Sequence, residues 1–213
     1  MYCVWDLYSM PAKKHSHHHR EKDTLSRLLS KVLRHDAIKM GLAMGKDGGV
    51  SVNDLLAHQL FRAYTAVDIE AVVAENDKKR FQLGEGRRGQ MMIRAAQGHT
   101  IDIVDDSALL TEILDASEVP VCIHGTYHAF LPSILEHGLS RMKRNHIHMA
   151  TGMPNGDEVI SGMRSSCQVV LHVDVAAAMA AGIKFYRSSN GVILSPGADG
   201  GVLPAKFLRV VHT

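Results

Sequence analysis

The first regular feature along the chain is a stripe of apolar side chains with the spacing of an α-helix. The stripe follows Asp23 and repeats at i, i+3, i+4, i+7 and i+8, so it predicts an amphipathic helix that buries one face. Its members are Leu25, Leu28, Leu29, Val32 and Leu33. On another face, Arg27, Lys31 and Arg34 recur beside His35. Such a row is usually a solvated face, and it can also bind an anion.

Short extended stretches and helices alternate in the segments that follow. Residues 50–52 predict a strand, followed by a short helix through Leu56. A capping box over Thr65–Asp68 opens another helix. Two extended segments, 80–83 and 91–95, are joined by a Gly-rich turn. Helix, strand, helix, helix and a two-stranded wing is the order of a winged-helix fold, which often contacts nucleic acid.

From residue 119 the pattern changes to short apolar runs bounded by turn residues, after a connector with a predicted helix over 107–116. The runs predict strands at 121–124, 147–150, 169–173, 184–186, 192–194 and 207–211. Few helices accompany them, which is typical of a compact, β-rich α+β unit. We therefore expect an α+β protein in three parts. These are a flexible leader over residues 1–22, a winged-helix lobe over 23–110 and a β-rich lobe over 111–213.

The composition is that of an ordinary globular protein, with 46% hydrophobic and 22% charged residues among 213. The net charge is only +2, so the field of the whole protein is too weak to indicate nucleic-acid binding, and any anion site must be local. Three widely spaced Cys without a CxxC pair indicate a reducing compartment. No apolar run is long enough to cross a membrane and no secretory signal is present, so we expect an intracellular protein, cytoplasmic or nuclear.

Histidine is unusually frequent, with 14 residues, and several stand where they can carry chemistry. The segment His124–Thr126 ends a predicted strand, and its central Gly permits a ligand to approach the backbone closely. His146 and His148 share one face of a strand, because side chains alternate. With Cys122 and His124 they suggest a zinc site, but no further ligand completes a tetrad at a recognised spacing.

Three further segments combine polar residues with turn chemistry. Arg164 follows Gly162 in a loop before a strand, and residues 94–99 end the wing with Arg, Gln, Gly and His. Residues 185–197 contain an Asn-Gly pair, which favours a β-hairpin. Taken singly, these segments are equally typical of a surface arginine, a strand end and a hairpin.

The order of the motifs is more specific than any one of them. They are Leu33-Arg34-His35, Lys79-Arg80-Phe81, Arg94 to His99, His124-Gly125-Thr126, His146-Ile147-His148, Gly162-Met163-Arg164 and Ser189 to Leu194. In this order they resemble the KptA-type RNA 2′-phosphotransferases, also called tRNA 2′-phosphotransferases, over residues 24–211. Thr100 stands where that family commonly has Ser, which removes none of the candidate functional side chains.

The resemblance implies both a fold and an activity. A winged-helix lobe is joined to an ADP-ribosyltransferase-like lobe, and the enzyme removes the internal 2′-phosphate left at an RNA splice junction. NAD is consumed as co-substrate. The 2′-phosphate first attacks C1″ of the nicotinamide ribose and nicotinamide leaves; the ribose 2″-hydroxyl then attacks the phosphorus. The products are 2′-OH RNA and ADP-ribose 1″,2″-cyclic phosphate, and the expected substrate is tRNA.

The resemblance also assigns the family's catalytic Arg-His-Arg-Arg set to Arg34, His35, Arg94 and Arg164. We expect the first three to grip the 2′-phosphate, since a planar guanidinium pairs bidentately with phosphate. Arg164 would neutralise charge as the phosphate attacks and is transferred. His35 either donates as an imidazolium or accepts a proton in the second step; the sequence leaves both open.

The NAD side of the site follows from the same resemblance. The residues expected there are His124, Gly125, Thr126, His148, Ser189, Asn190 and Val192. Val192 stands where many protein-modifying relatives have Glu, and a phosphate dianion is already a nucleophile that a carboxylate would repel. Val192 therefore fits a phosphate acceptor. Arg144 and His146 are further candidates for contacts to the pyrophosphate or adenosine.

Two alternatives remain beside the favoured function. One is ADP-ribosylation of terminal phosphates on nucleic acid, which stops after the first step. The other is a non-catalytic winged-helix module that binds nucleic acid through the basic row and the wing residues Arg87 and Arg88. We expect no metal ion, since arginines supply the positive charge, and a monomer without a membrane partner.

Overall fold

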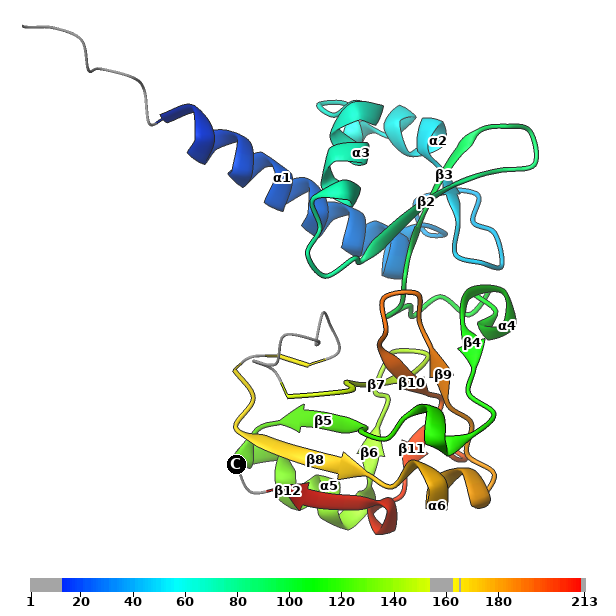
Figure 1. Cartoon of the computed structure of the whole chain (residues 1–213). Helices are drawn as coiled ribbons and strands as arrows, with labels where there is room; N and C mark the ends of the chain where they lie inside the picture. Colours follow the sequence, from blue (N-terminus) through cyan, green and yellow to red (C-terminus); the bar gives the residue numbers. More distant parts are fainter. Residues whose placement is uncertain (1–12, 154–162, 165, 212–213) are drawn as a thin grey trace, which may run out of the picture.

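A computed structural model describes residues 13–153, 163–164 and 166–211 and divides them into two lobes (Figure 1). Each lobe has its own hydrophobic core. Buried residues between Leu25 and Val104 form the first core, and buried residues between Ile113 and Phe207 form the second. The predicted α+β class is confirmed, because each lobe combines helices with antiparallel sheet.

The first lobe packs helices against a three-stranded sheet of order β1-β3-β2. Its elements are α1 (Lys13–Lys31), η1 (Val32–Asp36), β1 (Val50–Ser51), α2 (Val52–Ala57), η2 (Gln59–Phe61), α3 (Ala66–Ala74), β2 (Phe81–Glu85) and β3 (Met91–Ala95). The predicted capping box is confirmed: Thr65 Oγ1 accepts from Asp68 N at 3.3 Å, and Asp68 Oδ2 accepts from Thr65 N at 2.8 Å. The two predicted extended segments pair as the antiparallel β2–β3 hairpin.

Helix α1 begins at Lys13 rather than at the expected Asp23, so the expected end of the leader at residue 22 falls inside a helix. Residues 13–22 contain no Pro or Gly, and their Lys, Arg and Glu side chains favour helix, so nothing there ends the helix that the apolar stripe specifies. Residues 1–12 of the expected leader lie outside the described residues. The stripe itself is buried as predicted, with Leu29 and Leu33 at 0% exposure.

The second lobe consists of small antiparallel sheets with short helices at their edges. Its elements are α4 (Asp106–Leu109), β4 (Thr111–Glu112), η3 (Ala116–Glu118), β5 (Ile123–Thr126), η4 (His128–Phe130), α5 (Leu131–His137), β6 (Leu139–Ser140), β7 (Ile147–Met149), β8 (Val169–Val173), α6 (Val175–Ala180), β9 (Tyr186–Arg187), β10 (Ile193–Ser195), β11 (Val202–Leu203), η5 (Ala205–Phe207) and β12 (Leu208–Val211). The sheets have the orders β4-β9-β10-β7, β12-β8-β5 and β11-β6.

The predicted helix over 107–116 is wrong beyond its first turn. Helix α4 ends at Leu109, and residues 111–112 pair with β9 as strand β4. Ile113 N then donates to Phe185 O at 2.9 Å, which continues the strand pairing. Tertiary pairing therefore overrides the local helix propensity of this segment. Within the described part of the chain, no helix has the length and apolar character that crossing a bilayer requires.

The core of the first lobe depends on the buried face of α1. Replacement of Leu29, which is 0% exposed, by Ala should lower the free energy of unfolding by about 2–5 kcal/mol, because it removes buried methyl groups and leaves a cavity. Urea denaturation followed by circular dichroism measures the loss. The matched change Val67→Ala, at a site 71% exposed, should cost less than about 0.5 kcal/mol. Equal losses in the two variants would contradict this account of the core.

Candidate active site

Arg34 and His35 lie where α1 changes its hydrogen-bonding pattern. Residues Val32–Asp36 form a single π-helical turn, closed by Ala37 N donating to Val32 O at 2.9 Å. Such turns insert one extra residue into a helix and are common at functional sites. Leu33, before the pair, is fully buried in the first core. The turn therefore fixes Arg34 and His35 at the end of the helix that faces the second lobe.

Arg34 lies against the segment that follows β3. A Cβ built on Gly98 would lie 3.4 Å from Arg34 Nε, and Gly98 has a φ of +92°, so this position favours Gly both for its conformation and for the close approach of the guanidinium. Arg34 Nε and Nη2 are buried and have no hydrogen-bond partner among the described residues. The same is true of Nε2 of the neighbouring His99. Buried donors without acceptors are rare and costly, which indicates that a ligand supplies the acceptors.

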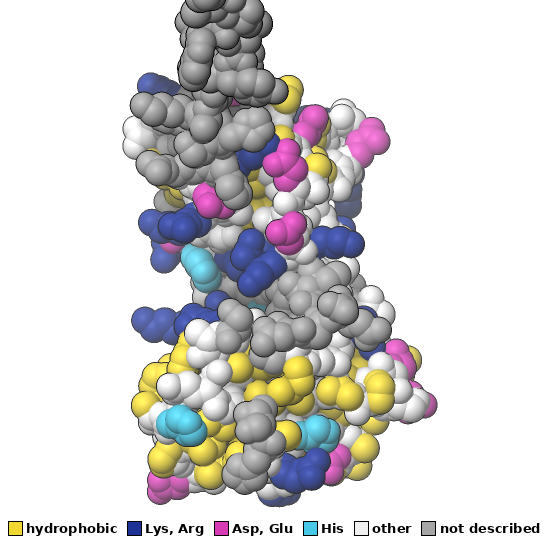
Figure 2. Space-filling view, turned by 60° about the vertical axis from the view of Figure 1, so that its left-hand side comes forward, with side chains coloured by type: hydrophobic (Ala, Val, Ile, Leu, Met, Phe, Trp, Pro, Cys, Tyr) yellow, Lys and Arg dark blue, Asp and Glu magenta, His cyan; other side chains and the backbone are white. Residues whose placement is uncertain are grey.

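The charges around Arg34 make this place attractive to anions. Burial, and then the positive charges of Arg144 and Arg80, lower the pKa of Arg34 to about 10, and it still remains protonated at neutral pH. Among the described residues, none of these three arginines has a carboxylate as an ion-pair partner. In Figure 2, Lys and Arg side chains gather on both sides of the junction between the lobes. The net charge of +2 thus conceals a local cluster of cations.

His35 is held by the same segment. Its Nδ1 lies 3.0 Å from Thr100 Oγ1, and the Thr100 hydroxyl in turn donates to Arg34 O at 3.4 Å. His35 Nδ1 therefore carries the proton, and Nε2 has the free lone pair. Burial, and then the charges of Arg144 and Arg34, lower the pKa of His35, so its ring is neutral in the free protein at neutral pH. Thr100 performs this role with the hydroxyl that a Ser would also provide.

Arg94 projects from β3 and is oriented by two partners. Its Nε donates to Gln82 Oε1 and its Nη1 donates to Asp47 Oδ2, both at 3.0 Å. Asp47 is itself fixed by accepting from Gly49 N at 3.0 Å. The guanidinium is thus directed by neighbours that leave part of it open to solvent, with its side chain 36% exposed.

Arg164 comes from the second lobe and is exposed. Tyr127 lies beside it. Hydrogen bonds to the Tyr127 phenol, from Ser166 first and then from Arg164, lower the pKa of that phenol. The charge of Arg164 also bears on Arg144, which joins it to the cation cluster around Arg34. Gly162, from the same motif, lies outside the described residues.

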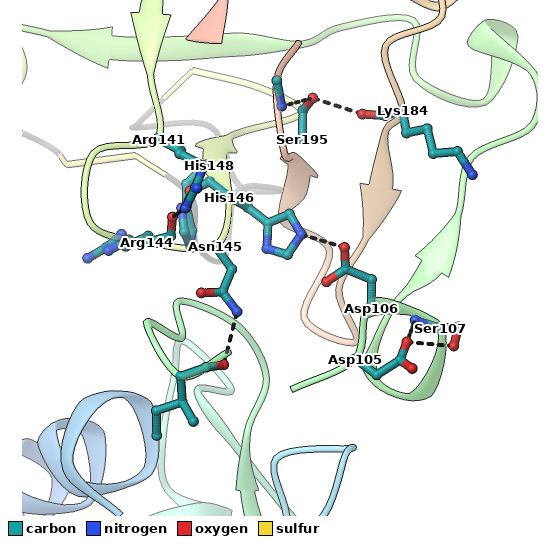
Figure 3. A network of polar contacts seen from close by, with 12 residues as sticks. Asp105, Asp106, Ser107, Arg141, Arg144, Asn145, His146, His148, Lys184 and Ser195 are labelled. Atoms are coloured by element: carbon teal, nitrogen blue, oxygen red, sulfur yellow. Dashed lines mark hydrogen bonds and ion pairs between the residues drawn. The ribbon is translucent and has the colours of Figure 1, made fainter. Parts of the chain in front are cut away.

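Three histidines of the second lobe, His124 on β5, His146 just before β7 and His148 on β7, each contact an oxygen atom. His124 Nδ1 donates to His148 O at 2.8 Å, and His148 Nδ1 donates to His146 O at 3.0 Å. His146 Nε2 lies 3.0 Å from Asp106 Oδ2 (Figure 3). Burial is the largest cause that lowers the pKa of both His124 and His148, so these two rings are neutral at pH 7. Because Nδ1 of the neutral His124 ring carries the proton, Nε2 keeps a lone pair that can accept a hydrogen bond from a ligand hydroxyl.

The rest of the predicted NAD segment is tightly enclosed. A Cβ on Gly125 would overlap the side chains of Met163 and Cys167, so only Gly fits here. Thr126 is 5% exposed, and its carbonyl accepts from Gln168 N at 2.9 Å. The predicted close approach at Gly125 is therefore occupied by the segment that carries Arg164.

The segment 188–192 forms a closed turn between β9 and β10. Asn190 Nδ2 donates across the lobe junction to Lys78 O at 2.9 Å, and Ser188 Oγ donates to Asn190 Oδ1 at 2.8 Å. Val192 is 0% exposed, so its side chain belongs to the core and lines no cleft. Ser189 is exposed and lines a cavity of about 280 Å³ whose other walls come from the first lobe, among them Phe81 and Gln82.

Gln97, His99 and Asn145 are site residues to which the sequence assigned no role. Gln97 Oε1 lies 2.8 Å from His148 Nε2, across the lobe junction. Asn145 N donates to His99 O at 2.9 Å, and Asn145 Nδ2 donates to Ile101 O at 3.2 Å (Figure 3). A polar Gln and His directly after an apolar strand was the available signal. It could not show that the partners come from the other lobe.

The described residues contain no group of three or more His, Cys, Asp and Glu that could hold a metal ion. Cys122, the remaining member of the zinc alternative, is buried with its Sγ 3.5 Å from Met149 Sδ, and burial raises its pKa to about 12. It therefore packs as an apolar side chain and not as a thiolate ligand.

The two lobes thus meet beside buried nitrogens of Arg34 that lack hydrogen-bond partners among the described residues. Residues 20–197 match the family described as RNA 2′-phosphotransferase, Tpt1 / KptA family, and the chain belongs to this family. It is 50% identical over 189 residues to tRNA 2′-phosphotransferase 1 of Danio rerio, an alignment that covers 87% of this chain and 83% of the relative.

Relatives with lower sequence identity also match most of the chain. Identity to tRNA 2′-phosphotransferase 1 of Homo sapiens is 45% over 199 residues, covering 91% of this chain and 78% of the relative. Identity to tRNA 2′-phosphotransferase of Saccharomyces cerevisiae is 38% over 177 residues, covering 80% and 77%. The resemblance that the ordered motifs indicated is confirmed.

His99 makes stability depend on pH. Burial, then Arg34, lowers the pKa of His99 from 6.5 to about 4, so the unfolded chain binds its proton first as the pH falls below 6.5. As the pH falls from 6.5 to 4, His99 therefore lowers the free energy of unfolding progressively, by about 2 kcal/mol at pH 5. The variant His99→Gln should lose about 2 kcal/mol less than the unaltered protein when urea unfolding is compared at pH 7 and pH 5. His128→Gln, at an exposed position, is the control and should leave the pH dependence unchanged.

Proposed function

We propose that this protein transfers the internal 2′-phosphate of a spliced RNA, a tRNA, to ADP-ribose derived from NAD. The observation that carries the proposal is the pair of buried, unpartnered nitrogens on Arg34 inside a cluster of arginines. A phosphate monoester brings close to two negative charges and three acceptor oxygens, which is the ligand that such a cluster lacks. The names of the relatives, tRNA 2′-phosphotransferases, give the acceptor the same identity.

The phosphate grip is formed from the first lobe. Arg34 offers Nε and Nη2, a planar fork that fits two phosphate oxygens, and Arg94 offers the open part of its guanidinium. Arg164 approaches from the second lobe and stabilises the charge of the phosphate as its bonds change. Each charged hydrogen bond contributes about 1.5–3 kcal/mol, which supports tight binding without a metal ion.

The second lobe holds NAD in this proposal. His124 presents an Nε2 lone pair that suits a ribose hydroxyl, and His148 lies beside it on β7. Two segments would form the walls of the same site, namely Gly125 and Thr126 on β5 and Ser189 and Asn190 in the turn between β9 and β10. Bound NAD supplies the ribose carbon that accepts the phosphate, a nicotinamide leaving group, and the hydroxyl that releases the phosphate from RNA.

His35 is prepared to accept a proton. Its Nδ1 donates to Thr100, and its Nε2 keeps a lone pair because burial, and then the charges of Arg144 and Arg34, lower the pKa of the ring. A neutral imidazole can take the proton of a ribose hydroxyl as that hydroxyl attacks phosphorus. The positive surroundings that lower its pKa also make the ring a good acid for the return of the proton.

The division of labour between the lobes is also part of the proposal. The order α1, β1, α2, α3 and the β2–β3 hairpin supports a winged-helix lobe over residues 23–110, which would bind RNA. The small antiparallel sheets support an ADP-ribosyltransferase-like lobe over residues 111–213. We propose that the protein acts as an intracellular monomer.

The decisive experiment incubates the protein with NAD and a short RNA that carries one internal 2′-phosphate, without added metal, and analyses RNA and nucleotides by mass. Loss of the phosphate together with ADP-ribose cyclic phosphate supports the proposal. A stable ADP-ribosyl product on terminal phosphates would support the alternative transfer reaction instead. Unchanged NAD with retained RNA binding would leave only a nucleic-acid-binding module.

Arg34→Met separates function from stability. The variant should lose roughly 100-fold or more in kcat/KM, because two charged hydrogen bonds to phosphate disappear. It should also raise the free energy of unfolding by about 1–3 kcal/mol, since an unpartnered buried cation is removed. Urea unfolding and turnover assays measure the two effects. Arg209→Met on the exposed face of β12 is the control and should change neither.

A further inference from the structure

Gln97 connects the two lobes at the candidate site. It follows β3 in the first lobe, is 6% exposed, and reaches His148 on β7 of the second lobe. His148 Nε2 lies 2.8 Å from Gln97 Oε1, and His148 Nδ1 lies 3.0 Å from His146 O. Both nitrogens of the imidazole are therefore engaged by the protein before any substrate binds.

Counting protons restricts the state of this ring. The carbonyl of His146 only accepts, so Nδ1 must carry a proton. An acceptor at Nε2 as well would require a second proton and a charged imidazolium. A neutral ring has a lone pair at Nε2 and needs a donor there. The carboxamide of Gln97 provides that donor when rotation about its last bond exchanges its oxygen and nitrogen ends.

The surroundings decide in favour of the neutral ring. Burial, then the charges of Arg144, His146 and Arg34, lowers the pKa of His148 to about 3. The described carboxylate nearest along this network, Asp106, is already engaged with His146 at 3.0 Å. An imidazolium would add another unpartnered cation to the cluster. The hydrogen bond at Nδ1 places the first proton, and burial among these cations excludes a second one.

We propose that Gln97 is a positioning residue that holds His148 as a neutral ring with its proton on Nδ1. His148 then contacts NAD with a ring of fixed orientation and transfers no proton. Only the mention of NAD rests on the proposed function; the state of the ring belongs to the free protein. Because Gly98, in the segment that carries Gln97, packs against Arg34, this hydrogen bond also aligns the NAD side of the site with Arg34.

The state of the ring can be read directly in the free protein. Long-range ¹H–¹⁵N correlation spectra distinguish protonated from unprotonated ring nitrogens, and the His148 signals are those lost in His148→Phe. We expect a protonated Nδ1 and an unprotonated Nε2 that do not change between about pH 5.5 and 8. Two protonated nitrogens, a proton on Nε2 alone, or a titration within this range would overturn the proposal.

Gln97→Glu tests the role of the carboxamide. The substitution keeps the shape but leaves only acceptors, so the second ring proton of His148 should appear at a higher pH than in the unaltered protein. The KM for NAD should rise at least about tenfold, with a smaller change in the KM for RNA. Gln59→Glu, an exposed change of the same chemistry, is the control and should leave both quantities unchanged.

The outcomes separate this proposal from the proposed function. A Gln97→Glu variant that folds and keeps both the unaltered ring spectrum and the unaltered KM for NAD overturns the role of Gln97. If that variant does not fold, the spectrum of the unaltered protein alone decides. An expected spectrum in a protein that never consumes NAD would reject the proposed reaction while the assignment of the ring stands.

Discussion

Repulsion among arginine side chains at the lobe junction is the constraint on which the rest of this structure depends. Arg34 has two buried nitrogens without acceptors among the described residues, and the charges of Arg144, from the second lobe, and Arg80, from its own lobe, act on it. This repulsion lowers the stability of the folded protein. The hydrophobic core of each lobe offsets the loss, and the hydrogen bonds of Asn145 and Asn190 connect the two lobes. An anion bound at the junction would therefore relieve this repulsion.

The same field explains the chemistry of the histidines. Burial keeps His35, His99, His124 and His148 neutral, and arginine charge adds to this effect for all but His124, so these rings add no further repulsion. Backbone carbonyls then determine which nitrogen carries the proton in His124 and His148. Arginine supplies charge that pH cannot remove, while histidine supplies hydrogen bonds and proton acceptance. The site divides electrostatic and acid–base work between two residue types.

Local patterns in the sequence predicted much of the first lobe. The apolar stripe of α1, the capping box at Thr65 and the wing strands are all confirmed, because each depends on neighbours within a few residues. The start of α1 and the segment 107–116 were wrong, since a missing helix stop and a strand pairing with β9 decided them. The ordered motifs identified the family. They could not show that Val192 is fully buried or that Gln97 reaches the other lobe, because those facts depend on tertiary packing.

The π-helical turn at Val32–Asp36 has a consequence for how this site tolerates change in length. Upstream, α1 is fixed by leucines that pack in the core; downstream, the chain is fixed by the hydrogen bonds of Thr100. The extra residue in the turn sets the direction in which its side chains point relative to the leucines of α1. Deleting one residue within the turn would restore regular α-helical bonding and rotate the side chains that remain in the turn, by up to about 100° around the helix axis. The orientation of Arg34 and His35 thus depends on the number of residues in the turn as well as on their identity.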